Sequence, residues 1–420
     1  GRLCYVVGMD ESRHKMPGAA KREAVKLRGL RGAKYLRLVR KLVRPLRDER
    51  ACVNRKLHFD DLTNYTLLHF FNPALSSMRA LQQASTLRGF QERFGLPRFS
   101  LGSFSEAGRR FNPERLRLVI AATVGQVQDL GQLRELSGLQ RHLTVVDSTL
   151  MRGFADMLWA LWRTGEQGFK VHLEYEILRG VPTEARLTDG KAPDAQNLLE
   201  NLSANRLYVL DRGFADYRLL AAILDRKSSF VVRVRSNAVC TVIEKRKISP
   251  AARKAGVTKD WIVQLGCATS PELHGRRLRI VEVRVPNPGV LLGRRPRRLP
   301  VDSKTKTFRA QRTETVLLLA TDLLDLSAEL IALIYRSRWQ IELFFRWFKV
   351  ILDGEHLLFH NPNGLMILIY CAMLASVLVV LWTGRKPTKR ALEMFCHYFM
   401  GLVDDDELAA WLDRTCPAAA

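Results

Sequence analysis

One long apolar run limits the folds open to this chain more than any other feature of the sequence. From Leu365 to Trp382 the residues are almost all apolar, and Ser376 interrupts them. A helix that is apolar on every side either spans a membrane or lies inside a large core. The rest of the chain is highly basic, and Tyr370, Cys371 and several small residues fall within the run. We therefore interpret it as a buried central helix of an α/β protein and expect no association with a membrane.

The charge of the chain predicts its class of partner. The formal net charge is +25 and the isoelectric point is about 10.2. A balance this basic indicates a polyanion, most simply nucleic acid. The alternatives are a ribosome-associated protein and a protein whose charge serves only solubility. With 420 residues and 47% hydrophobic content, the chain can bury a large core and is expected to form about two to three domains.

The cysteines and the N-terminus indicate a reducing compartment. The seven cysteines are scattered, and no pair has the Cys-x-x-Cys spacing of a zinc site. Scattered free thiols are typical of a cytoplasmic protein. The first residues lack the apolar core and the small-residue cleavage site of a secretory signal. We expect a cytoplasmic location.

Changes in composition divide the chain into six segments. Residues 1–55 are rich in Lys and Arg and predict a basic tail or helix. Residues 56–135 have helical spacing, with a capping-box pattern from Ser103 to Glu106, and are the candidate DNA-binding domain. The remaining segments are the first part of an α/β core, a β-rich insertion, the second part of the core and a C-terminal helical segment, at 136–235, 236–315, 316–385 and 386–420. Basic clusters at 276–279 and 294–298 are expected in exposed loops of the insertion.

Two aspartates follow short apolar runs in the first part of the core. Asp147 ends one predicted strand and Asp211 ends another, and between them residues 171–177 alternate as a half-buried strand expected to pair with 183–188. Reactive groups gather beyond the carboxyl ends of strands in open α/β sheets. If the two strands are neighbours, the carboxylates lie side by side and favour a bound cation. The alternative is that each aspartate only caps a turn.

A predicted helix from Ser327 to about Leu352 carries a narrow polar stripe. Tyr335, Arg338, Glu342 and Lys349 share one face of it, whereas most other positions are apolar. One interpretation is an internal salt bridge between Arg338 and Glu342, four residues apart. The other is a third metal-binding carboxylate flanked by cations that bind phosphate.

The stripe and the two aspartates together resemble a large family of bacterial insertion-sequence transposases. The spacing Tyr-x2-Arg-x3-Glu-x6-Lys is similar to the family signature, and the contexts Asp147-Ser-Thr and Asp211-Arg-Gly-Phe-Ala-Asp-Tyr also match. The resemblance covers about 140 to 385. It implies a ribonuclease H-like mixed sheet flanked by helices, a β-rich insertion between Asp211 and Glu342, and an N-terminal helical domain.

The resemblance also implies the chemistry. Asp147, Asp211 and Glu342 would bind two Mg²⁺ or Mn²⁺ ions and catalyse DNA cleavage and strand transfer, as two-metal sites do at phosphorus. Tyr335, Arg338 and Lys349 would contact DNA phosphates. The expected partners are double-stranded DNA, as element ends and target, and a second copy of the chain in the DNA complex, in the bacterial nucleoid. By the same resemblance, the basic loops of the insertion would hold DNA near the cut.

Two other interpretations stay open at this point. The chain could be another metal nuclease of the same fold, acting on junctions or on RNA–DNA hybrids. It could also be an inactive or domesticated derivative that only binds DNA. Strand-transfer products would distinguish the first, and the intact triad argues against the second.

Overall fold

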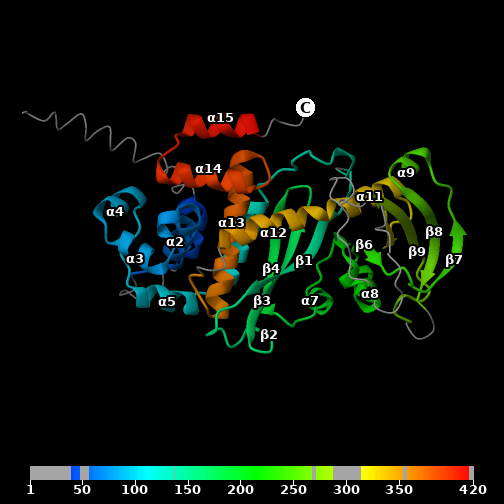
Figure 1. Ribbon diagram of the computed structural model, residues 1–420, viewed down its shortest axis with the longest axis horizontal. Coiled ribbons are helices and arrows are strands. Elements are labelled where there is room, and N and C mark those ends of the chain that lie inside the picture. Colours follow the sequence, from blue (N-terminus) through cyan, green and yellow to red (C-terminus); the bar gives the residue numbers. More distant parts are fainter. Residues whose placement is uncertain are drawn as a thin grey trace, which may run out of the picture.

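A ten-stranded sheet runs through the molecule in the computed structural model, with helices on both of its faces (Figure 1). The structure describes residues 39–47, 56–136, 138–266, 271–286, 314–352 and 357–415. The strands are β1 His142–Arg152, β2 Leu161–Arg163, β3 Glu166–Glu176, β4 Val181–Asp189, β5 Arg206–Leu210, β6 Ser229–Val234, β7 Cys240–Lys245, β8 Val257–Leu265, β9 Leu278–Pro286 and β10 Glu314–Thr321.

The helices surround this sheet and form most of the N- and C-terminal parts. They are α2 Phe59–Phe71, α3 Met78–Ser85, α4 Arg88–Phe94, α5 Leu101–Arg110, α6 Glu114–Val124, α7 Asp194–Glu200, α8 Tyr217–Asp225, α9 Pro250–Lys254, α11 Ala328–Ser337, α12 Trp339–Leu352, α13 Pro362–Thr383, α14 Lys389–Met400 and α15 Asp405–Thr415. Single turns of 3-10 helix lie at Arg44–Leu46, Pro73–Leu75, Arg134–Leu136, Arg212–Phe214 and Pro271–Leu273.

The core strands have the order and directions of a ribonuclease H-like sheet. Strands β1, β3 and β4 form an antiparallel meander, and β5 then pairs parallel to β1 and β6 parallel to β5. Alternating side chains face opposite layers. Val145 and Val209 pack in the cluster that includes α11, α12 and α13, whereas Val146 and Leu210 pack in the cluster of α7 and α8. The expected α/β fold, a mixed sheet flanked by helices, is confirmed.

Strand β3 differs from the half-buried strand that its alternation predicts. Residues 171–177 are buried on both faces. Two of its polar groups have partners inside the protein: Glu174 Oε1 pairs with Arg186 at 3.3 Å, and His172 Nε2 lies 2.8 Å from the Thr188 hydroxyl. Buried polar groups persist where such partners satisfy them. The alternation therefore identified a strand but not its burial.

The strands of the segment 236–315 continue the core sheet. Strand β10 pairs antiparallel with β6 on one side and with β9 on the other, and β8 and β7 follow outward. Arg279, expected in an exposed basic loop, instead lies within β9 and is 2% exposed. The basic cluster expected at 294–298 lies outside the described residues. Cys240 and the two other cysteines in the described ranges, Cys371 and Cys396, carry free thiols.

Helix α13 contains the apolar run and is buried over almost its whole length. It is the one helix in the described ranges that is long and apolar enough to cross a membrane. Its neighbours are α2, α5, α6, α12 and β4, and 89% of its apolar window is buried inside the protein. The apolar run therefore lies mostly inside the protein, as expected for a central core helix.

The terminal segments are helical where they are described. Helices α2 to α6 form the N-terminal part, and α14 packs on α2 (Figure 1). Helix α5 begins after Ser100, whose hydroxyl accepts a hydrogen bond from the Ser103 amide. The capping box expected to begin at Ser103 therefore lies three residues earlier. Within the basic segment 1–55, the structure describes residues 39–47. Of these, residues 39–43 are helical.

Candidate active site

Asp147 and Asp211 lie side by side because β1 and β5 are parallel neighbours. The last pair of their ladder joins Val145 to Val209. Two residues further along each strand come Asp147 and Asp211, on the face that packs against α11 and α12. Asp147 does not end its strand as expected, because β1 continues to Arg152 in its pairing with β3. Asp211 does end β5.

Each aspartate also binds the backbone that follows it. The Ser148 amide donates to Asp147 Oδ1 at 2.8 Å, and the Gly213 amide donates to Asp211 Oδ1 at 2.7 Å. A Cβ on Gly213 would lie 3.0 Å from that carboxylate oxygen, so the tight turn favours glycine. The turn-capping interpretation therefore holds for Asp211.

The expected long helix consists of two segments joined at Arg338. The Arg338 amide donates to the Tyr335 carbonyl at 3.1 Å, and the Ile341 amide donates to the Arg338 carbonyl at 3.2 Å. Such i to i+3 bonds tighten a helix locally. Ser327 precedes α11 as expected, but its side chain makes no capping bond. The interruption lies where the helix passes the two aspartates.

The Arg338 guanidinium lies between two carboxylates of the predicted triad. Its Nη2 donates to Glu342 Oε1 at 2.5 Å, and its Nη1 lies 3.5 Å from Asp147 Oδ2. Only 18% of the Arg338 side chain is exposed. The internal salt bridge proposed for this helix face is present, and it extends across to the sheet. It therefore joins Glu342 on α12 to Asp147 on β1.

The ionisation of these groups shows that they form one electrostatic cluster. Burial raises the pKa of Asp147 to about 6, with Asp211 and Glu342 adding to the rise and the Ser148 amide and Arg338 opposing it. Burial also raises the pKa of the Tyr335 hydroxyl, which Arg338 and Arg233 oppose and Asp211 reinforces. Burial acts to lower the pKa of Arg338, but Glu342, Tyr335 and Asp147 together raise it.

Five of the six predicted site residues therefore meet in one place. Lys349 is the exception, since it is exposed further along α12 and pairs with no carboxylate among the described residues. Sequence reasoning missed Arg233, a lone cation in the apolar strand β6 that acts on Tyr335. Its charge within a buried strand was the available signal. Arg233 also lines a cavity of about 500 Å3 with further basic side chains, Arg212, Arg235 and Lys259, beside Trp261.

The chemistry of the donor set fits a divalent cation. Carboxylate oxygens are the ligands that Mg²⁺ and Mn²⁺ prefer. Two of the three carboxylates already bind a cation, because the Arg338 guanidinium stands between Asp147 and Glu342. With Arg338 in that position, no three acidic, His or Cys side chains of the described ranges converge as ready metal ligands. The donor types thus suit a metal, and in this structure the Arg338 guanidinium stands between two of them.

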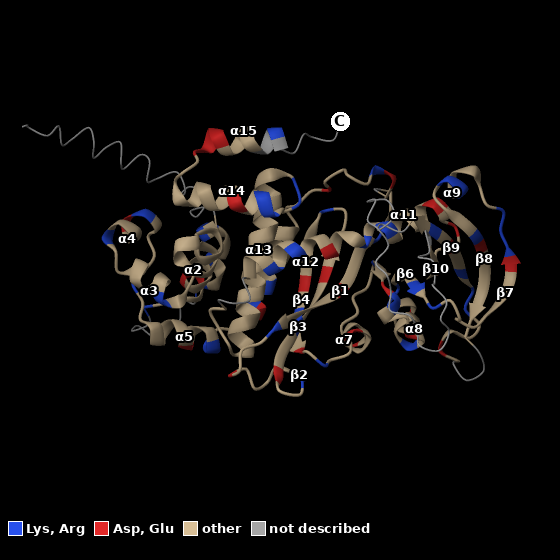
Figure 2. Ribbon diagram, in the orientation of Figure 1, with Lys and Arg blue, Asp and Glu red and all other residues tan. Residues whose placement is uncertain are grey.

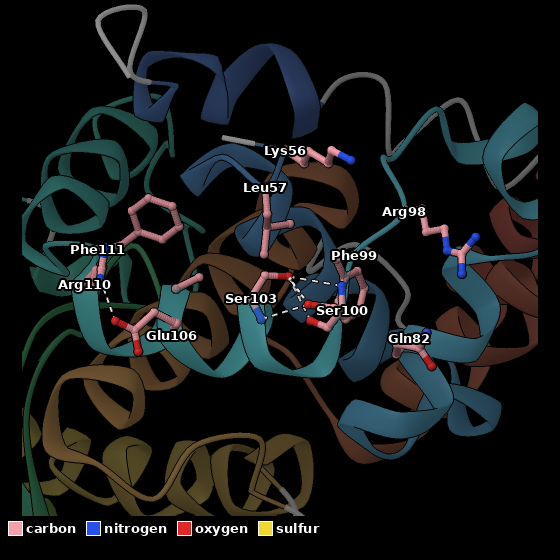
Figure 3. Close-up of a pocket in the computed structure, with 11 residues that line it drawn as sticks. Lys56, Leu57, Gln82, Arg98, Phe99, Ser100, Ser103, Glu106, Arg110 and Phe111 are labelled. Atoms are coloured by element: carbon pink, nitrogen blue, oxygen red, sulfur yellow. Dashed lines mark hydrogen bonds and ion pairs between the residues drawn. The ribbon is translucent and has the colours of Figure 1, made fainter. Parts of the chain in front are cut away.

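A second basic site lies in the N-terminal helical part. A cavity of about 650 Å3 lies against α5, with the Glu106–Arg110 pair toward one end and Arg98 at the other (Figure 3). Lys56 and Arg98 are exposed and pair with no carboxylate in the part of the chain that the structure describes. Figure 2 shows further basic residues on α4, α8, α9 and α12.

Comparison with known proteins indicates the family of this site. The family of transposase DDE domains matches residues 138–378. A protein named as a transposase in Sinorhizobium fredii is 28% identical over 271 residues, 64% of this chain and 68% of that protein. A protein named as an insertion-sequence transposase in Geobacillus stearothermophilus is 25% identical over 315 residues, 74% of each. Among solved structures, a piggyBac transposase complex with hairpin DNA has a TM-score of 0.39 at 12% identity, covering 92% of this chain and 80% of its own.

Proposed function

This chain belongs to the transposases with a DDE domain, and we propose that it moves a bacterial insertion sequence by cutting its DNA ends and joining them to target DNA. The observation that carries this proposal is that Arg338 joins Asp147 to Glu342, and that Asp211 follows the strand paired with that of Asp147. The related proteins are transposases of insertion sequences by name, which supports the same substrate.

The three carboxylates would hold divalent metal ions. When bound, such ions supply an activated attacking oxygen and stabilise the leaving oxygen of an in-line displacement at phosphorus. In the first reaction, water attacks a phosphodiester at the element end, and the bond from phosphorus to the 3′-oxygen breaks. In the second, the freed 3′-hydroxyl attacks a target phosphodiester, forms a new bond to phosphorus and releases a target 3′-hydroxyl.

The chain's own cations would position the phosphates for both steps. Arg338 lies at the carboxylates and can grip a phosphate with its planar fork, whereas Lys349 on the exposed side of α12 acts as a point charge. Tyr335 can donate its hydroxyl, since burial raises its pKa and keeps it protonated. The cavity beside Arg233 extends the basic surface away from the carboxylates.

The N-terminal segment 56–135 would bind the element end before cleavage. Lys56 and Arg98 border its cavity and are free to contact phosphates (Figure 3). The basic residues 1–55 would add affinity through counterion release. Because two element ends must be joined to one target, we propose that two copies of the chain assemble on DNA, in the bacterial cytoplasm and nucleoid.

The test is cleavage and joining of a DNA duplex that carries the inverted repeats flanking this coding frame. The wild-type protein with Mg²⁺ should release 3′-hydroxyl ends and join them to a second DNA. Asp211→Asn should bind the duplex but neither cut nor join it. The matched control is Asp225→Asn, because Asp225 is 65% exposed and pairs with Arg276 away from the triad.

The outcomes separate this proposal from its rivals. Normal cleavage by Asp211→Asn would show that its carboxylate is not catalytic. Cleavage without joined products would indicate a metal nuclease of the same fold. DNA binding with neither activity in the wild type would indicate a derivative that only binds DNA.

A further inference from the structure

Three of the four carboxylate oxygens of Asp147 and Glu342 already face Arg338 or the backbone. Asp147 Oδ1 accepts the Ser148 amide, and Asp147 Oδ2 faces the Arg338 guanidinium at 3.5 Å. Glu342 Oε1 binds the same guanidinium at 2.5 Å. A carboxylate oxygen that binds a divalent ion cannot keep a guanidinium at the same distance, because the two cations repel each other strongly at such short range.

Arg338 cannot resolve this conflict by losing its proton. The guanidinium remains charged at any accessible pH and has only donors, and its pairing with Glu342 and Asp147 raises its pKa further despite burial. It must therefore move for a metal to bind. The Arg338 side chain is only 18% exposed in its present position, so a displaced guanidinium needs another anion, and a phosphodiester matches its planar fork.

We propose that Arg338 couples metal binding to DNA binding by exchanging its partners. Without DNA, its guanidinium neutralises Asp147 and Glu342 and weakens their affinity for divalent ions. When a DNA phosphate reaches the site, Arg338 turns to the phosphate and frees both carboxylates. The inference rests on the proposed function and adds to it an order of events, in which the metal site completes only when DNA is present.

The position of Arg338 in the fold suits this exchange. It lies at the junction between α11 and α12, where the helix is interrupted, so its side chain starts from the helix face nearest the sheet. Tyr335 and Glu342 lie beside it on the same face. By linkage, the factor by which DNA strengthens metal binding equals the factor by which metal strengthens DNA binding.

The experiment measures Mn²⁺ affinity by electron paramagnetic resonance of the free ion. The proteins are the wild type, Arg338→Met, and the matched control Arg336→Met, which removes the same charge from an exposed position two residues away. Asp147→Asn reports whether the ions bind at the carboxylates. Each protein is measured alone and with an element-end duplex already cut at its 3′ end. Arg338→Gln replaces Arg338→Met if the latter melts far below the wild type.

The coupling predicts one result for Mn²⁺ affinity without DNA and another for Mn²⁺ affinity with the cut duplex. Without DNA, Arg338→Met should bind Mn²⁺ about tenfold more tightly than Arg336→Met, within the usual range of coupling between sites. The cut duplex should strengthen Mn²⁺ binding by the wild type about tenfold and by Arg338→Met less than about twofold. Loss of a nearby charge without partner exchange would tighten Mn²⁺ binding but leave the strengthening by DNA the same in Arg338→Met as in the wild type.

Two results would overturn the inference in different ways. If Asp147→Asn loses Mn²⁺ while Arg338→Met binds it no more tightly than Arg336→Met, the coupling is wrong and the proposed function stands. If Asp147→Asn binds Mn²⁺ as well as the wild type in both conditions, the ions bind elsewhere, and the proposed active site is wrong together with the coupling.

Discussion

Arg279 is expected to hold the inserted strands against the loop that leads into the catalytic helices. Its guanidinium pairs with Asp260 through two hydrogen bonds of 2.7 and 2.8 Å, and the two side chains are 2% and 5% exposed. Its Nη1 also donates to the carbonyls of Leu323 and Leu324 at 3.2 Å each, and to that of Leu326. One buried side chain thus joins β9, β8 and the turn between β10 and α11.

Removing this cation should cost a large share of the stability. In Arg279→Met, Asp260 stays buried without its partner, and breaking such a pair costs about 3–5 kcal/mol. Replacing both partners, as Arg279→Met with Asp260→Leu, removes the unpaired charge and should recover about 2 kcal/mol or more. Full recovery is not expected, because the carbonyls bound by Arg279 lose their donor, at about 1–3 kcal/mol for a buried group.

The assay is urea unfolding followed by tryptophan fluorescence, for which Trp261 on β8 is adjacent to Asp260. The control is Arg277→Met, since Arg277 is 61% exposed and lies 3.7 Å from Glu244. An exposed pair of this kind contributes about 0–1 kcal/mol. The reasoning is refuted if Arg279→Met unfolds with a free energy close to that of Arg277→Met, or if the double variant is less stable than Arg279→Met.

Three further predictions address the site, the apolar helix and pH. Arg338→Lys keeps the charge beside Glu342 but loses the planar fork, so strand transfer should fall sharply with little change in melting temperature, and Lys349→Arg should be milder; a much lower melting temperature with normal joining per folded molecule would contradict this. Leu374→Lys places a charge at a fully buried position of α13 and should give unfolded or insoluble protein, whereas the wild type should be extracted without detergent; a need for detergent would contradict the core assignment. Burial lowers the pKa of His172 to about 4, so its neutral form contributes stability that is complete above its unfolded pKa of about 6.5 and is lost as pH falls toward 4. Urea unfolding at pH 7 and pH 5 should show this loss, and His172→Gln should lessen it; an equal loss in the variant would assign it to other groups.

Much of the fold could be predicted because its signals are local. The apolar run of α13 has no alternative to burial except lipid, and short apolar segments bounded by turns identified β1, β5, β6 and β10. The candidate site could also be predicted from the sequence. Asp147 and Asp211 each come at the end of a short apolar run, and Glu342 lies on the polar face of a predicted helix. These patterns depend on the spacing of apolar and polar residues along one helix or strand, which can be read from neighbouring positions in the sequence.

The contacts between distant segments were decided only by the tertiary structure. Whether Asp147 and Asp211 are neighbours depends on the parallel register of β1 and β5, and the extension of β1 past Asp147 depends on its second partner, β3. Pairing across strands buries both faces of β3, and Asp260 with three carbonyls draws Arg279 out of an expected loop into the interior. Arg338 likewise gained a contact with Asp147 that no helix periodicity contains. In each case the partner lies far away in the sequence. The contact therefore depends on how the elements pack and on which buried charges can pair, and the local sequence does not encode either.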